Sequence, residues 1–94
     1  MMFRLWGKIM KNNKFLEEKV IAIDNPSLNT NDKIQAALEI FCHDFDLEKP
    51  MWFDKNTKEF NQISKTSFRE DQFIESIWFD YLEIELIDDG KKKP

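Results

Sequence analysis

Cysteine, histidine and glycine are scarce in this sequence, and their scarcity argues against several kinds of site. Cys42 is the only cysteine and His43 the only histidine, so the chain cannot form an internal disulfide and lacks the ligands of a structural zinc site. Two glycines cannot form a glycine-rich phosphate loop, and no Gly-x-Ser-x-Gly elbow is present. The sequence therefore offers no recognisable motif for zinc binding, phosphate binding or acyl transfer.

Long apolar runs are missing as well. No stretch approaches the roughly 18 apolar residues of a membrane helix. The first ten residues contain Arg4 and Lys8 and lack the apolar core of a secretion signal. We therefore expect a cytoplasmic protein without a membrane segment.

The residues that are present are typical of a small globular domain. The chain of 94 residues is 41% hydrophobic and 14% aromatic, with nine Phe and three Trp, which is enough to bury one core at this length. We expect a single domain over residues 1–89, followed by a flexible basic tail at residues 90–94.

Charge is unevenly distributed along the chain, although the net charge is only −4. Residues 1–30 carry five bases against three acids, whereas residues 70–89 carry eight acids and no base. These segments either form a bipolar surface used for association, or pair as neighbouring strands with opposite charges facing each other. We favour pairing because both segments have strand-like patterns.

The longest strand-like run is Ile77–Ile87, around which we expect the fold to be organised. Its second half alternates, with Leu82, Ile84 and Leu86 on one side and glutamates on the other. Its first half is apolar on both sides. We therefore predict a strand that enters the sheet covered on both faces and leaves it with one face in water.

A β-hairpin is predicted at the N-terminus. Residues 3–10 and 15–24 are strand-like, and Lys11–Lys14 between them contains two asparagines, which tolerate the positive φ of a tight turn. Gly7 interrupts the apolar side of the first strand. It marks either a β-bulge or the close approach of a bulky side chain, for which Trp6 is the candidate.

One long helix is predicted over Thr30–Phe45, with Asn29 or Thr30 as its N-cap. Its apolar residues recur at helical spacing and form one stripe: Ile34, Ala37, Leu38, Phe41 and Phe45. Residues 48–76 are ambiguous, with patterns for a short helix capped by Asn56 or Thr57 and for an edge strand. The fold class is therefore α+β: a small antiparallel sheet, formed by the N-terminal hairpin and the C-terminal strand, with one main helix on one face.

The densest group of reactive side chains is the segment Cys42–Asp46, but helical geometry separates them. Adjacent helical residues do not face each other, and His43 points away from the apolar stripe. We therefore expect a half-buried Cys42 and a solvated His43. Asp44, Asp46 and Glu48 have a spacing that is similar to the start of a calcium loop, but the sequence after them lacks the glycine and the final glutamate of such a loop. We predict no catalytic residue, no cofactor and no metal.

A basic surface on the hairpin supports one functional hypothesis. Arg4, Trp6 and Lys8 share one side of the first strand, and Lys11 and Lys14 lie at the turn. Bases can stack on an aromatic residue of a basic sheet. However, a net charge of −4 offers little attraction to phosphate, so nucleic-acid binding through the four basic residues is the alternative hypothesis.

The excess of aromatic residues supports the favoured hypothesis. Two strands are apolar on both sides, and a chain of this length cannot fully bury every large side chain. Aromatic residues are enriched in protein interfaces. We therefore predict a non-catalytic protein-interaction module or homodimer, whose contact surface includes Trp6, Trp52, Trp78 and Tyr81.

Two segments carry a resemblance to known proteins. Leu5-Trp6-Gly7-Lys8-Ile9 and Phe79-Asp80-Tyr81-Leu82-Glu83-Ile84-Glu85 are similar to segments of small bacterial proteins of unknown function. The resemblance implies a stand-alone bacterial domain. It carries no activity, ligand or site residue.

Overall fold

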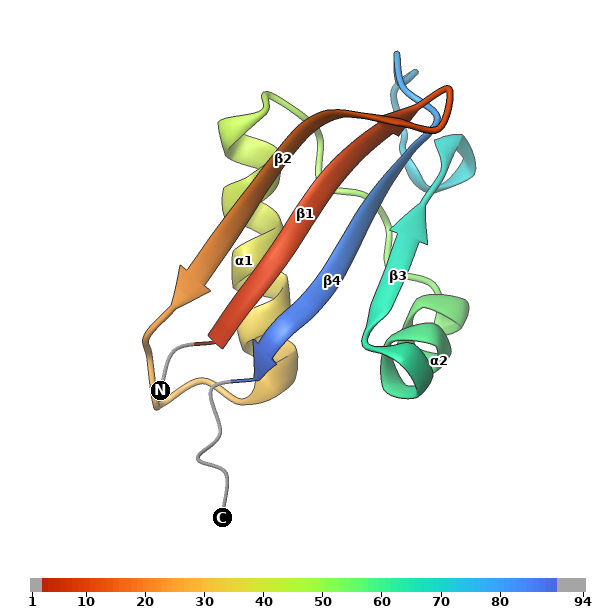
Figure 1. Cartoon of the computed structure of the whole chain (residues 1–94). Coiled ribbons are helices and arrows are strands. Elements are labelled where there is room, and N and C mark those ends of the chain that lie inside the picture. The colour runs from red at the N-terminus through yellow and green to blue at the C-terminus, as the bar shows by residue number, and fades with distance from the viewer. Residues whose placement is uncertain (1–2, 90–94) are drawn as a thin grey trace.

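A computed structural model describes residues 3–89 of the chain and confirms the α+β class. Its four strands form one antiparallel sheet in the order β2-β1-β4-β3, and both helices lie away from the face that is turned toward the viewer in Figure 1. The tail predicted at residues 90–94 lies outside the described residues. The elements are β1 (Phe3–Lys11), β2 (Lys14–Ile23), α1 (Thr30–Asp44), α2 (Asp54–Ile63), β3 (Lys65–Phe68), a 3-10 turn (Glu70–Gln72) and β4 (Tyr81–Asp89).

The hairpin of β1 and β2 follows the prediction closely. Asn12 and Asn13 have φ values of 54° and 62°, the left-handed conformation that a two-residue hairpin turn requires. The strand pairing shifts between Ile9 and Met10, where β2 contains one extra residue. The bulge therefore lies near the turn and not at Gly7.

Helix α1 also begins where its sequence signals indicate. Asn29 is the N-cap, and its side-chain oxygen accepts a hydrogen bond from the backbone N–H of Asp32 at 2.8 Å, which satisfies one of the free donors of the first turn. The apolar stripe faces the sheet: Ile34, Ala37, Leu38 and Phe41 are buried, and Phe45 packs against the same core.

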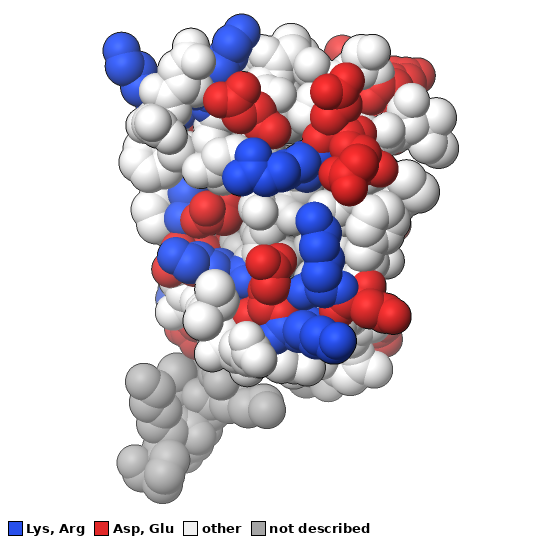
Figure 2. All heavy atoms as spheres, turned by 90° about the vertical axis from the view of Figure 1, so that its right-hand side faces the viewer, with Lys and Arg blue, Asp and Glu red and all other residues white. Residues whose placement is uncertain are grey.

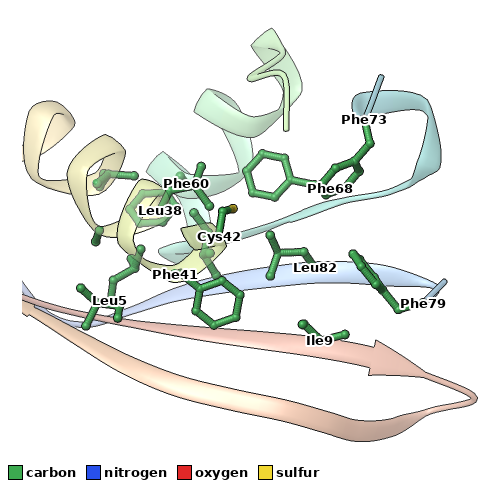
Figure 3. Close-up of a cluster of buried hydrophobic side chains, with 14 of the residues drawn as sticks. Leu5, Ile9, Leu38, Phe41, Cys42, Phe60, Phe68, Phe73, Phe79 and Leu82 are labelled. Atoms are coloured by element: carbon green, nitrogen blue, oxygen red, sulfur yellow. The ribbon is translucent and has the colours of Figure 1, made fainter. Parts of the chain in front are cut away.

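Gly7 lies directly opposite a side chain of α1. A Cβ atom built at Gly7 would lie 2.3 Å from two ring carbons of Phe41, so the glycine makes room for this ring. Figure 3 shows Phe41 pointing from the helix toward the strands, with Leu5, Ile9 and Leu82 around it. The prediction that Trp6 is the bulky neighbour was wrong, because Trp6 lies on the opposite side of β1.

Strand β4 begins later than predicted. Residues 78–80 form bends, and the strand starts at Tyr81. Phe79 turns into the core and packs edge-on against Phe73, with ring centroids 5.9 Å apart, while Trp78 remains 56% exposed. The first half of the predicted strand, where apolar residues do not alternate with polar ones, is therefore a loop that buries the Phe79 ring. It is not a strand covered on both faces.

A buried polar network holds α2, β3 and the 3-10 turn together. The Asn56 amide nitrogen donates to the Thr66 hydroxyl at 2.7 Å and to the Ser67 carbonyl at 3.1 Å. The Asn56 amide oxygen accepts from the backbone N–H of Phe53 and from the Gln72 amide, both at 2.8 Å. Phe53 is the N-cap of α2, so the cap predicted at Asn56 or Thr57 was wrong, and Asn56 instead secures the start of the helix from its first turn.

Candidate protein-interaction surface

Within residues 3–89 the sheet has one face covered by α1 and one face that carries no helix. The strand register places alternate residues of each strand on this second face, which we call the open face. Figure 1 looks onto it, with α1 behind the sheet. The open face consists of Arg4, Trp6, Lys8 and Met10 from β1, Phe15, Glu18, Val20 and Ala22 from β2, Tyr81, Glu83, Glu85 and Asp88 from β4, and Lys65 and Ser67 from β3.

The β1–β2 half of the open face is rich in apolar side chains. Phe15 is 55% exposed and Val20 is 46% exposed, which is unusual for large apolar residues in a small domain. The half-buried Trp6 is opposite Val20 in the β1–β2 register, and the centroid of its ring lies 6.2 Å from that of Phe15. Leu16, the extra residue of the bulge, is also exposed. These residues expose apolar surface on one strand pair, with the exposed Glu18 between Leu16 and Val20 along β2.

The centre of the open face is a buried lysine between two glutamates. The Lys8 amine donates to Glu85 at 2.8 Å and to Glu83 at 3.0 Å, and it lies 3.8 Å from the centre of the Trp6 ring. Burial lowers the pKa of Lys8, but the hydrogen bonds and charges of Glu85 and Glu83 outweigh it, so the net pKa is raised. Lys8 is therefore charged at neutral pH and fixed in place.

Opposite charges face each other across β1 and β4, as the charge distribution predicts. In addition to the Lys8 pairs, the Arg4 guanidinium lies 3.2 Å from the Asp88 carboxylate. Two of the four basic residues proposed for nucleic acid, Arg4 and Lys8, are thus paired with acids. Lys11 and Lys14 at the hairpin turn are exposed, so the positive charge that remains for phosphate lies at the turn and not at Trp6.

The four predicted interface aromatics do not lie on one surface. Trp6 and Tyr81 share the open face, where Arg69 lies 4.7 Å from the centre of the Tyr81 ring. Trp52 packs on the core side against Phe68, with ring centroids 5.7 Å apart. Trp78 lies in the loop before β4. The structure therefore brings together two of the four.

Trp52 and Trp78 each line a separate small hollow. The hollow at Trp52 has a volume of about 240 Å³ and lies between the start of α1 and helix α2, lined mainly by Ile34, Trp52, Thr57 and Phe60. The hollow at Trp78 is about 100 Å³ and is bordered by the acids Asp46, Glu48 and Glu75. The Glu48 carboxylate already accepts two backbone N–H groups of the loop, so it serves to hold the loop.

Cys42 and His43 near the end of α1 have opposite environments, one buried and one exposed. Cys42 is 3% exposed, more buried than predicted, and burial raises the pKa of its thiol to about 12. The side chain of His43 is 91% exposed, as expected. Within residues 3–89 no group of three His, Cys, Asp or Glu side chains is placed to hold a metal ion.

The side of the molecule formed by α2 and β3 shows no charge pattern that points to a partner. Figure 2 looks at this side and shows basic and acidic side chains interspersed across it. Single-sign surfaces attract nucleic acid or charged partners over a distance, and this surface lacks that character. The open face is thus the more distinctive surface.

Comparison with known proteins adds no family. No protein-family model, no curated protein and no solved structure matches this chain. The resemblance to small bacterial proteins therefore stays a prediction. None of the helices described in residues 3–89 has the length and apolar character needed to cross a membrane.

Proposed function

We propose that this protein is a non-catalytic cytoplasmic interaction module whose contact surface is the open face, and that its partner is a second copy of the same chain. The observation that supports the proposal is the exposed apolar surface of Trp6, Phe15 and Val20, with Leu16 at the adjoining bulge, on a sheet face that no helix covers within residues 3–89. An exposed apolar area beside fixed polar groups is typical of a protein contact site.

The composition of the open face suits an interface more than an active site. Trp6, Met10 and Tyr81 are of the types enriched in interfaces. Lys8 already forms ion pairs with Glu83 and Glu85. Its amine is therefore desolvated and paired in the single chain, and association adds no further desolvation cost for it. A surface arranged in this way loses little polar solvation on association.

The test is the molar mass in solution, measured by size-exclusion chromatography with light scattering over a range of concentrations. We expect a mass twice the 11.4 kDa of the chain. Trp6→Ser and Phe15→Ser should shift the mass toward that of one chain. Ile63→Ser is the matched control, because Ile63 is 58% exposed on α2 but lies off the open face. A monomer at every concentration, or equal effects of all three substitutions, contradicts the proposal.

Nucleic-acid binding at the hairpin turn is the second candidate. It is supported by the exposed Lys11 and Lys14 beside a sheet face that carries Trp6. It predicts salt-sensitive binding of single-stranded oligonucleotides that weakens in a Lys11→Ala/Lys14→Ala variant. The absence of binding at low salt, measured by fluorescence anisotropy, ends this candidate.

A further inference from the structure

Strand β2 leaves a long edge of the sheet without a partner. It runs for ten residues at the margin of the sheet and, within the described chain, joins only β1 in the strand order. Residues 14–20 are exposed without interruption, and neither Pro nor Gly breaks the strand. Its one irregularity is the bulge at Leu16, after which residues 17–23 pair regularly with β1. The other edge, β3, is only four residues long. Long regular edges are templates for pairing with another chain, whereas short edges are poor ones.

The sequence of β2 complements itself in one antiparallel register. When two copies pair about a two-fold axis perpendicular to the sheet, each residue faces a residue on the same side of the sheet. With Glu18 on the axis, Glu17 of each copy faces Lys19 of the other, and Leu16 faces Val20. Oppositely charged and apolar pairs of this kind stabilise neighbouring strands.

Neighbouring registers lack this complementarity. With Lys19 on the axis, two lysines face each other and Glu17 faces Ile21. With Val20 on the axis, the charged residues face Ala22, Ile21 and Ile23. Of these three registers, only the one centred on Glu18 pairs acid with base, and its single unfavourable contact is between the two Glu18 side chains themselves. The register centred on Leu16 also pairs acid with base, Lys14 with Glu18, but it places Glu17 opposite Phe15 and sets the bulge on the axis.

Glu17 and Lys19 are placed to make these contacts. Both are exposed and lie on the α1 side of the sheet, where Lys19 already pairs with Asp44 at the end of α1. Glu17 has no ion-pair partner within residues 3–89. In the paired form Lys19 would lie between two carboxylates, as Lys8 lies between Glu83 and Glu85.

We propose that two copies of this chain pair antiparallel through β2, with Glu18 on the two-fold axis, so that two four-stranded sheets become one. This inference rests on the proposed function for its partner, the second copy of the chain, but not for its contact surface. It goes further in naming the edge, the register and the residues at the seam. The two open faces would then form one continuous surface, with Leu16 and Val20 at the join.

Charge reversal tests the register. Glu17→Lys or Lys19→Glu alone places like charges opposite each other twice in the dimer, so each should weaken dimerisation at least tenfold. The double variant Glu17→Lys/Lys19→Glu restores both pairs and should recover the affinity. Glu18→Gln removes the one repulsion and should tighten the dimer. Circular dichroism of each variant checks the fold, because Lys19→Glu also loses the pair with Asp44.

Crosslinking tests the same register by geometry, in a Cys42→Ala background. A residue on the axis faces its own copy at a Cα separation of about 4.5–5.5 Å, which a disulfide can span. Glu18→Cys should therefore oxidise to a dimer. Ala22→Cys is the control, since its two copies would be offset by roughly 27 Å along the strands and should not crosslink.

The outcomes separate this inference from the proposed function. In one outcome the charge reversals do not change dimerisation, Glu18→Cys does not crosslink, and Trp6→Ser abolishes the dimer. This outcome overturns the β2 pairing and leaves the open face as the contact. In the opposite outcome the charge reversals change the dimer affinity as expected and Trp6→Ser does not. This outcome supports the β2 pairing and contradicts the open face as the contact. A monomer at every concentration overturns both.

Discussion

At the scale of the residue, Gly7 is the position where the sheet tolerates no side chain. A Cβ there would lie 2.3 Å from carbons of the Phe41 ring, and this ring is buried at the centre of the core. Gly7→Ala should therefore destabilise the protein by about 3 kcal/mol, the upper part of the range for overpacking. Urea unfolding followed by circular dichroism measures the loss.

A second substitution identifies the cause of that loss. Phe41→Leu shortens the side chain that meets Gly7, so Gly7→Ala should cost clearly less in the Phe41→Leu background than in the wild type. If the two losses simply add, contact with the ring is not the reason for the glycine.

The sequence indicated Gly7 as special but not the residue that makes it so. The break in the apolar side of β1 was visible, and close approach was one of its two interpretations. Trp6 was the wrong partner because successive strand residues point to opposite faces. The correct ring comes from α1, and the position of a helix along a sheet is decided by tertiary packing that periodicity does not encode.

Cys42 gives a second prediction at this scale. Its buried thiol has a pKa raised to about 12, and the thiolate is the reactive form. The folded protein should therefore react with iodoacetamide at pH 8 far more slowly than the urea-unfolded chain, which mass spectrometry can follow over time. Fast labelling of the native protein would show that the end of α1 opens readily.

At the scale of the element, Lys8 joins β1 to β4 through two carboxylates. Lys8→Met keeps the length of the side chain but leaves Glu83 and Glu85 close together without a cation. Because both glutamates are partly exposed, the loss at pH 7 should be about 2 kcal/mol, below that of a fully buried pair. Urea titration of both proteins provides the comparison.

The pH dependence of this pair has a definite sign. The folded-state pKa of Lys8 is raised above its unfolded value, so its stabilisation is fully present below about pH 10 and is lost as pH rises through the folded pKa. The stability difference between wild type and Lys8→Met should shrink above that pH. A difference that stays constant from pH 7 to pH 11 contradicts the role assigned to Lys8.

The elements that the sequence predicted are those with a regular apolar period. The β1–β2 hairpin and α1 agree within one or two residues, and the pairing of basic with acidic segments is confirmed by Arg4 and Lys8 on β1. Residues 48–76 were ambiguous because α2 and β3 are short and are joined in part by a network of Asn56, Thr66 and Gln72. Buried polar side chains have no periodic signature, so hydrophobic patterns do not reveal them.

At the scale of the whole molecule, the candidate surface was half predictable. Strand parity placed Trp6 and Tyr81 on the same face once both strands joined one sheet. Trp52 and Trp78 lie in irregular segments, where parity does not apply, and they packed elsewhere. The sequence did not predict that the open face would carry no helix within residues 3–89, because the number of helices that cover this sheet depends on how the segment 48–76 folds.

Self-association would couple the stability of the whole molecule to its concentration. If the folded dimer is the stable form, its melting temperature should rise by about 3–5 °C for each tenfold increase in protein concentration, because unfolding releases two chains. Differential scanning calorimetry across two decades of concentration measures this. Glu17→Lys serves as the matched variant, since it changes only an exposed side chain on β2 and should melt at a temperature that concentration changes much less. A wild-type melting temperature that does not depend on concentration, in a protein that elutes as a dimer, would mean that each chain folds and unfolds without help from its partner.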